Sequence, residues 1–202
     1  MKPRELQYAV RIRLGRLSFV AGLLLLWTGC CTPTGTPAVA LIDLEGRPHP
    51  WVELSGPRGM VLVFVGVDCP ISNRALPEIS ALRRSVESRG VHVALIYANP
   101  LDTTQQVRTH LEEYALTIPA FRDPGFHVAK RYQAHVTPEV VFLTQDGHLI
   151  YRGRINDQSS ALGRDRPQAT CHDLADALEA YLATGQVPGR VVPAVGCSFR
   201  SP

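Results

Sequence analysis

The chain has 202 residues with 45% hydrophobic and 19% charged side chains, a length and composition suited to one domain with a sizeable core. The formal net charge is +3, but the segment before Cys30 holds five basic residues and one acidic residue, which leaves 16 basic and 17 acidic residues in the remainder. Because the remainder is nearly neutral and has no basic run interleaved with aromatic residues, the sequence argues against nucleic-acid binding.

The first 29 residues are typical of an export signal. Basic residues precede an apolar run from Leu17 to Trp27, which is much shorter than the about 20 residues that a membrane-spanning helix needs. The run leads into Thr28-Gly29-Cys30, which resembles the lipobox of bacterial lipoproteins, so we expect lipidation at Cys30. Cleavage without lipidation and an uncleaved anchor are the alternatives, and Cys31 is a weaker candidate for the lipid.

An anchor at Cys30 places the protein on the periplasmic side of a bacterial membrane. Residues 30–37, rich in Thr, Pro and Gly, are the expected tether, and residues 38–185 are the expected domain. Disulfides persist in that compartment, so cysteines there are candidates for redox chemistry. The scattered histidines and cysteines show no zinc-binding spacing, and we expect neither a metal nor a cofactor.

Two apolar runs in the first half of the domain predict buried strands of a parallel sheet, at Met60–Val67 and Val91–Tyr97. The segment between them has apolar residues at helical spacing, which completes a β-α-β unit. A capping-box pattern, Thr103 with Gln106, predicts the start of a second helix. Asp123-Pro124 predicts the start of a third.

The second half of the domain predicts antiparallel strands. Val140–Thr144 and Leu149–Arg152 flank Asp146-Gly147, a strong hairpin signal. After a polar stretch, Thr170-x-x-Asp173 predicts a helix that ends at Gly185, and residues 186–202 are expected to form an irregular tail. This order predicts an α/β fold with a central mixed sheet flanked by helices.

The most informative single residue is Cys69, between the first predicted strand and the following helix. A thiol in the first turn of a helix meets unpaired N–H groups and the positive end of the helix dipole, which favour the thiolate. Arg74 is expected to favour the thiolate as well, and Asp68 to oppose it. Ser72 stands where a second cysteine would complete a C-x-x-C pair, so Ser72 cannot resolve a mixed disulfide.

Together these residues resemble the thioredoxin-like superfamily, in its redoxin branch of peroxiredoxin-like and exported thiol–disulfide proteins. The resemblance covers about residues 38–181 and depends on Cys69, on Pro77 eight positions later, and on Thr137-Pro138 before the hairpin. It implies a thioredoxin-like fold, a cis bond before Pro138, and a Thr137 backbone that pairs with an extended peptide.

Two family patterns are missing. Peroxide-reducing members resemble one another in P-x-x-x-T/S-x-x-C, but Leu62 and Gly66 occupy the proline and hydroxyl positions here, which argues against peroxidase activity. Copper-delivering members have a second cysteine where this chain has Asn73, which argues against copper binding.

The tail completes the resemblance. Similar exported redoxin proteins share several segments of this chain and end in a short Gly-Cys tail, matched by Gly196-Cys197. The resemblance therefore implies that Cys197 resolves the mixed disulfide of Cys69, with Cys171 as the rival.

The leading hypothesis is a membrane-tethered thiol–disulfide oxidoreductase. It would act on a client protein or a small-molecule disulfide and exchange electrons with a thiol donor. A peroxiredoxin-like peroxidase and a non-catalytic binding module with the same fold are the alternatives.

Overall fold

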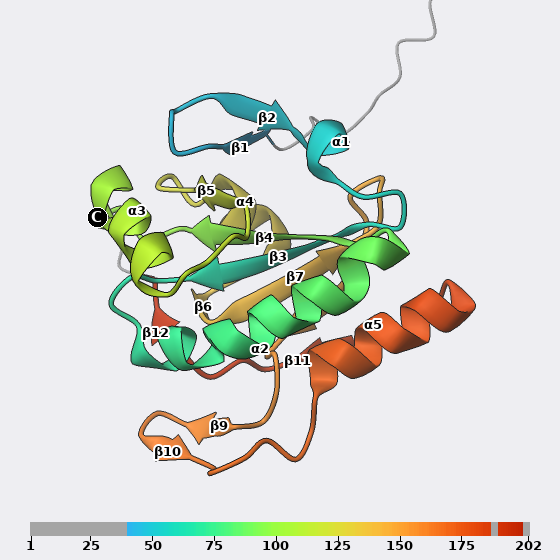
Figure 1. Ribbon diagram of the computed structural model, residues 1–202. Coiled ribbons are helices and arrows are strands. Elements are labelled where there is room, and N and C mark those ends of the chain that lie inside the picture. The colour runs from blue at the N-terminus through green and yellow to red at the C-terminus, as the bar shows by residue number, and fades with distance from the viewer. Residues whose placement is uncertain (1–39, 187–189, 200–202) are drawn as a thin grey trace, which may run out of the picture. The chain divides into compact units, whose positions relative to one another are not determined.

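The computed structural model describes residues 40–186 and 190–199, within which the main feature is an eight-stranded sheet. The strand order is β11-β8-β7-β3-β4-β5-β1-β2 (Figure 1). Its strands are β1 (Ala40–Ile42), β2 (Pro48–Pro50), β3 (Met60–Val65), β4 (His92–Tyr97), β5 (Ala120–Arg122), β7 (Glu139–Leu143), β8 (Leu149–Gly153) and β11 (Arg190–Val192). The described helices are α1 (Trp51–Leu54), α2 (Pro70–Val86), α3 (Thr104–Glu113), α4 (His127–Tyr132) and α5 (Asp173–Thr184), with a 3-10 turn, η1 (Glu87–Arg89).

The centre of the sheet confirms the predicted mixed arrangement. Strand β3 runs parallel to β4 and antiparallel to β7, and β7 forms the predicted hairpin with β8. Every residue of β3 and β7 is buried, because helices cover both faces of the sheet.

Alternating side chains divide the core between the two faces. Val61, Val63 and Val65 of β3 pack on the face covered by α2 and α5, whereas Leu62 and Phe64 pack on the face that carries α1 and α4. This division follows from the two-residue period of a strand. The central strands therefore hold the carboxyl end of β3 in a fixed place.

Two of the predicted helix ends were correct and two were wrong. Both hydrogen bonds of the capping box at Thr103 form, and Gly185 ends α5 in the left-handed conformation. Helix α4 begins at His127 instead of Asp123, and the Asp123 carboxylate accepts the N–H groups of His127 and Ala129 in its first turn. Thr170 does not begin α5, since its N–H and hydroxyl both bind Asp157.

Several short elements were not predicted. They are α1, η1, β1, β2, β5, β9 (Ser159–Ala161) and β10 (Arg164–Asp165). The tail is more regular than expected, since β11 pairs with β8 and β12 (Cys197–Ser198) pairs with β6 (Val136–Thr137). In the described part of the chain no helix is both long and apolar enough to cross a membrane. The signal segment, Cys30 and Cys31 lie outside the described residues.

Candidate active site

Cys69 lies where β3 gives way to α2, as predicted. It is the N-cap residue of α2, and its Sγ accepts the N–H of Ser72 at 3.4 Å. Pro70 fits the first helical position because its missing N–H would have no partner there. Cys69 is only 4% exposed, and the buried Ser72 hydroxyl has no hydrogen-bond partner among the described residues.

The Thr137-Pro138 segment faces Cys69 from the start of the β7–β8 hairpin. The bond between the two residues is cis, as the resemblance implied. The Thr137 carbonyl accepts a hydrogen bond from the Cys69 thiol at 3.0 Å, although the residues are 68 positions apart. The sheet thus brings together two segments that are distant in sequence.

Cys197 completes the cluster. Strand β12 pairs antiparallel with β6, in a register that sets Cys197 opposite Thr137. Its Sγ lies 2.9 Å from that of Cys69, which is a hydrogen-bond contact longer than the about 2.05 Å of a disulfide. A cavity of about 80 Å³ adjoins the two sulfurs. The structure therefore places a second thiol beside Cys69.

Cys171 lies elsewhere, in the loop before α5. Its backbone is held by Asp157, which accepts the Cys171 N–H at 2.9 Å and donates its own N–H to the Cys171 carbonyl. Its side chain is exposed. Of the two candidate resolving residues, the structure brings only Cys197 to Cys69.

Opposing effects set the acidity of Cys69. Burial opposes ionisation, but hydrogen bonds from the Cys197 thiol, the Thr137 side chain and the Ser72 N–H outweigh it, so the pKa of the Cys69 thiol is lowered. The Thr137 carbonyl acts in the other direction, because it can accept only from the protonated thiol. The net effect favours the nucleophilic thiolate.

This lowered pKa predicts the pH dependence of alkylation in the reduced protein. Because the thiolate is the reacting form, the rate of iodoacetamide modification at Cys69 should rise with pH and reach half its maximum below the about pH 8.5 of an ordinary cysteine. Mass-spectrometric peptide mapping measures Cys69 separately from the other cysteines. Cys197→Ala removes the thiol donor and should move the midpoint upward; a midpoint at or above about pH 8.5 in the unaltered protein would contradict the assignment.

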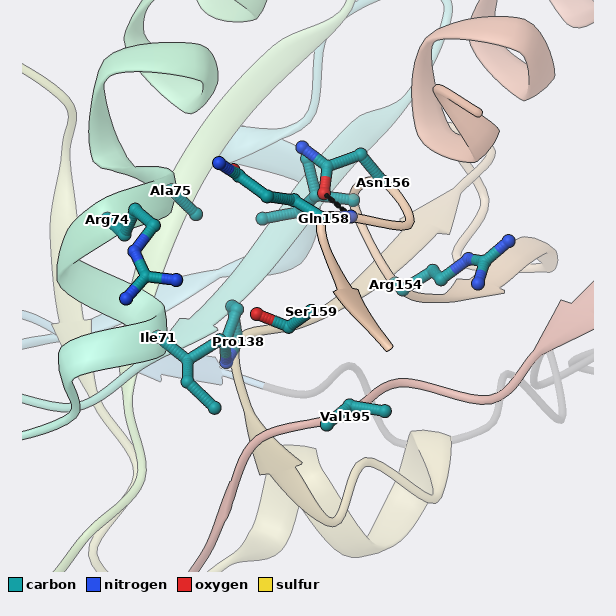
Figure 2. Close-up of a pocket in the computed structure, with 10 residues that line it drawn as sticks. Ile71, Arg74, Ala75, Pro138, Arg154, Asn156, Gln158, Ser159 and Val195 are labelled. Atoms are coloured by element: carbon teal, nitrogen blue, oxygen red, sulfur yellow. Dashed lines mark hydrogen bonds between the residues drawn. The ribbon is translucent and has the colours of Figure 1, made fainter. Parts of the chain in front are cut away.

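Arg74 does not contact the thiol. Its guanidinium forms an ion pair with Asp165 of β10, so an effect on the thiolate could act only through space. Arg74 also lines a small cavity of about 30 Å³ beside Pro138. Figure 2 shows Ile71 of α2, Pro138 and Val195 of the tail around this cavity.

A chain of hydrogen bonds that sequence reasoning missed supports the turn before Cys69. The amide of Asn73 donates to the Val67 carbonyl at 3.0 Å, and its oxygen lies 2.9 Å from Nε2 of His110. The Tyr97 hydroxyl lies 2.8 Å from Nδ1 of the same ring. Every contact is satisfied if Tyr97 donates to Nδ1 and His110 donates from Nε2, which fixes a neutral imidazole. Burial lowers the pKa of His110, in agreement with that form.

A buried carboxyl group also reaches this turn. Asp102, 3% exposed, accepts the Val67 N–H at 3.3 Å and the Asn99 amide at 2.8 Å. Burial raises its pKa, and the nearby Asp68 charge adds to the effect. In the described part of the chain no three or more His, Cys, Asp or Glu residues are grouped so that they could hold a metal ion.

Comparison with known proteins agrees with this geometry. The model of the AhpC/TSA family matches residues 34–152. The thiol-disulfide oxidoreductase ResA of Halalkalibacterium halodurans is 29% identical over 110 residues, which are 54% of this chain and 61% of ResA. The match therefore spans only about three-fifths of the length of that relative.

Solved structures agree on the fold. An uncharacterised conserved protein from Geobacillus kaustophilus superposes with a TM-score of 0.69 at 25% identity, over 82% of this chain and 89% of that one. A hypothetical protein from Sinorhizobium meliloti superposes with a TM-score of 0.69 at 24% identity, over 82% and 91%. The match over residues 34–152 and the placement of Cys69 opposite a cis-proline lead to one conclusion: the chain belongs to the AhpC/TSA family and has a thioredoxin-like fold.

Proposed function

We propose that this protein is a thiol–disulfide oxidoreductase with Cys69 as nucleophile and Cys197 as resolving thiol. The observation that carries the proposal is the 2.9 Å contact between the two sulfurs, beside the Thr137 carbonyl. The lowered pKa of Cys69 and the similarity to the thiol-disulfide oxidoreductase ResA support it.

Exchange proceeds in two steps. The Cys69 thiolate attacks one sulfur of a client disulfide, forms a mixed disulfide, and releases the other client sulfur as a thiolate. Cys197, as thiolate, then attacks Cys69 Sγ, which forms the Cys69–Cys197 disulfide and releases the second client thiolate. The client gains two electrons and the protein loses two; a thiol donor then returns the protein to its dithiol form. The same steps in reverse oxidise a client dithiol.

We place this chemistry on the periplasmic side of a bacterial membrane, with Cys30 as the lipid-bearing residue. The basic and apolar signal segment and the sequence Thr28-Gly29-Cys30 support this placement. A lipid anchor would hold the domain near membrane-bound clients and donors. The chemistry at Cys69 does not depend on the anchor.

A titration separates exchange from peroxide reduction. Reduced protein is mixed in one series with hydrogen peroxide and in another with a disulfide-bonded peptide, and the cysteine products are mapped by non-reducing mass spectrometry. We expect rapid formation of a Cys69–Cys197 disulfide with the peptide and slow reaction with peroxide, because Gly66 lacks the hydroxyl found in peroxide-reducing members.

Other products would point to other functions. Faster reaction with peroxide than with the peptide would favour a peroxidase. A Cys69 inert to both oxidants would leave a binding module. A Cys69–Cys171 product would assign resolution to Cys171.

A further inference from the structure

The last described residues of the tail pair with β6 as an extended peptide would. We call the surface along β6 beside Cys69, on which they lie, the groove. Strand β12 pairs with β6 in the register Cys197 to Thr137 and Ser198 to Val136. The Phe199 N–H continues the pairing to the His135 carbonyl at 3.3 Å. Cys197 Sγ lies 2.9 Å from Cys69 Sγ. It therefore occupies the position that a client sulfur would take just before thiol–disulfide exchange. The tail therefore shows which side chains this groove accepts on either side of a cysteine.

The position before the cysteine accepts only glycine. A Cβ atom on Gly196 would lie 2.2 Å from the Thr137 oxygen and 2.6 Å from its carbonyl carbon. Both are backbone atoms, so a larger residue would push the strand away from Thr137. Glycine here is a steric requirement of the groove.

The position two residues after the cysteine holds an aromatic ring. Phe199 stacks on Phe126, with ring centroids 5.8 Å apart and 19° between the planes, and meets Phe64 at 5.9 Å. The backbone of Phe126 has a φ of +56°, a left-handed conformation that is uncommon for an aromatic residue. On the other side of the cysteine, Val195 lines the cavity beside Ile71 and Pro138 (Figure 2).

From these contacts we propose that the groove selects client segments of the form apolar–Gly–Cys–x–aromatic, and that the tail competes with them for the same groove. The proposal rests on the proposed function, since the client cysteine must reach Cys69. A client pairs with β6 after β12 leaves, forms its mixed disulfide with Cys69, and is released when Cys197 returns. The tail is thus both the resolving segment and an internal competitor.

Chromogenic peptides test the selection. The full-length Cys197→Ser protein is mixed with peptides whose cysteine is disulfide-bonded to 5-thio-2-nitrobenzoate. Attack of the Cys69 thiolate on the peptide sulfur forms the mixed disulfide and releases the coloured 5-thio-2-nitrobenzoate anion. Val-Gly-Cys-Ser-Phe, which copies residues 195–199, is compared with Val-Ala-Cys-Ser-Phe and Val-Gly-Cys-Ser-Ala. The double variant Cys69→Ser, Cys197→Ser gives the rate at which the remaining cysteines react, and this background rate is subtracted.

We expect the copied peptide to react at least about tenfold faster than either altered peptide, equivalent to about 1.4 kcal/mol. Equal rates for the three peptides would overturn the selection while leaving exchange intact. If Cys69 also failed to react with the small reagent 5,5′-dithiobis(2-nitrobenzoate), the proposed function itself would fail.

A second variant tests the competition. In the Cys197→Ser chain, Phe199→Ala removes the ring contacts of the tail and should speed reaction with the copied peptide several-fold. Val52→Ala, an exposed apolar position on α1, is the matched control and should leave the rate unchanged. An unchanged rate in the Phe199→Ala chain would overturn the competition.

Discussion

Replacing Cys69 by serine should lower disulfide exchange to the uncatalysed background. A serine hydroxyl is a far weaker nucleophile than a thiolate at neutral pH and cannot form a disulfide, so neither step of the reaction can occur. The hydroxyl can still accept the Ser72 N–H, so the N-cap of α2 is retained. The measurement is the rate at which reduced protein cleaves a disulfide-bonded peptide, followed by chromatography of the released thiols.

Cys171→Ser is the matched control. Cys171 is exposed, its described hydrogen bonds are made by its backbone, and serine keeps that backbone. The Cys171→Ser variant should therefore catalyse disulfide exchange at the rate of the unaltered protein. Exchange that survived Cys69→Ser would show that Cys69 is not the nucleophile. An equal fall in both variants would show that Cys171 is required too. Thermal unfolding of both variants checks that the fold is intact.

The parts of the fold that could be predicted have strong local signals. Buried strands such as β3 are long apolar runs, the capping box at Thr103 is a four-residue pattern, and the β7–β8 turn has Gly147 at a φ of +79°. Three-residue strands such as β1 and β5 are too short for a periodic pattern to appear. The errors at Asp123 and Thr170 have different causes. The Asp123 carboxylate caps α4 from four residues before the helix begins, whereas the Thr170 hydroxyl binds Asp157 in the preceding loop.

The candidate site divides in a similar way. Cys69 and the cis-proline were predictable because each lies in a recognisable local pattern. The contact of Cys197 with Cys69 spans 128 positions, and it was predicted only through the resemblance of the Gly196-Cys197 tail, because spacing alone left Cys171 open as the rival. His110 did leave a signal, since it shares a helix face with Val107 and Tyr114 at intervals of three and four residues, but its contact with Asn73 depends on how α3 packs beside α2.

The tail explains how a chain without a C-x-x-C motif can hold two thiols in contact. In a C-x-x-C pair the second thiol lies one helical turn from the first, and Ser72 occupies that position here. In this chain the second thiol reaches Cys69 from strand β12. The proposed resolution therefore depends on β12, and the Cys197 thiol can be removed without altering Cys69.

Cys197→Ser should consequently trap the reaction halfway. With Cys69 intact the first step proceeds, but among the described residues no other thiol lies close enough to attack the mixed disulfide, so the covalent adduct between Cys69 and the client accumulates. Non-reducing mass spectrometry after mixing with a disulfide-bonded peptide should show this adduct in most of the Cys197→Ser protein. In the unaltered protein it should be a minor, short-lived species, because Cys197 is positioned to displace the client.

The comparison with Cys171→Ser makes the result specific to the tail. That variant retains Cys197 at the site and should proceed to the Cys69–Cys197 disulfide without accumulating adduct. Adduct in Cys171→Ser, with none in Cys197→Ser, would move the resolving role to Cys171 and require its loop to reach Cys69. A client with a second cysteine of its own can also displace itself from Cys69, so the peptide used must release its other half into solution. Under that condition the lifetime of the adduct measures resolution by the protein alone.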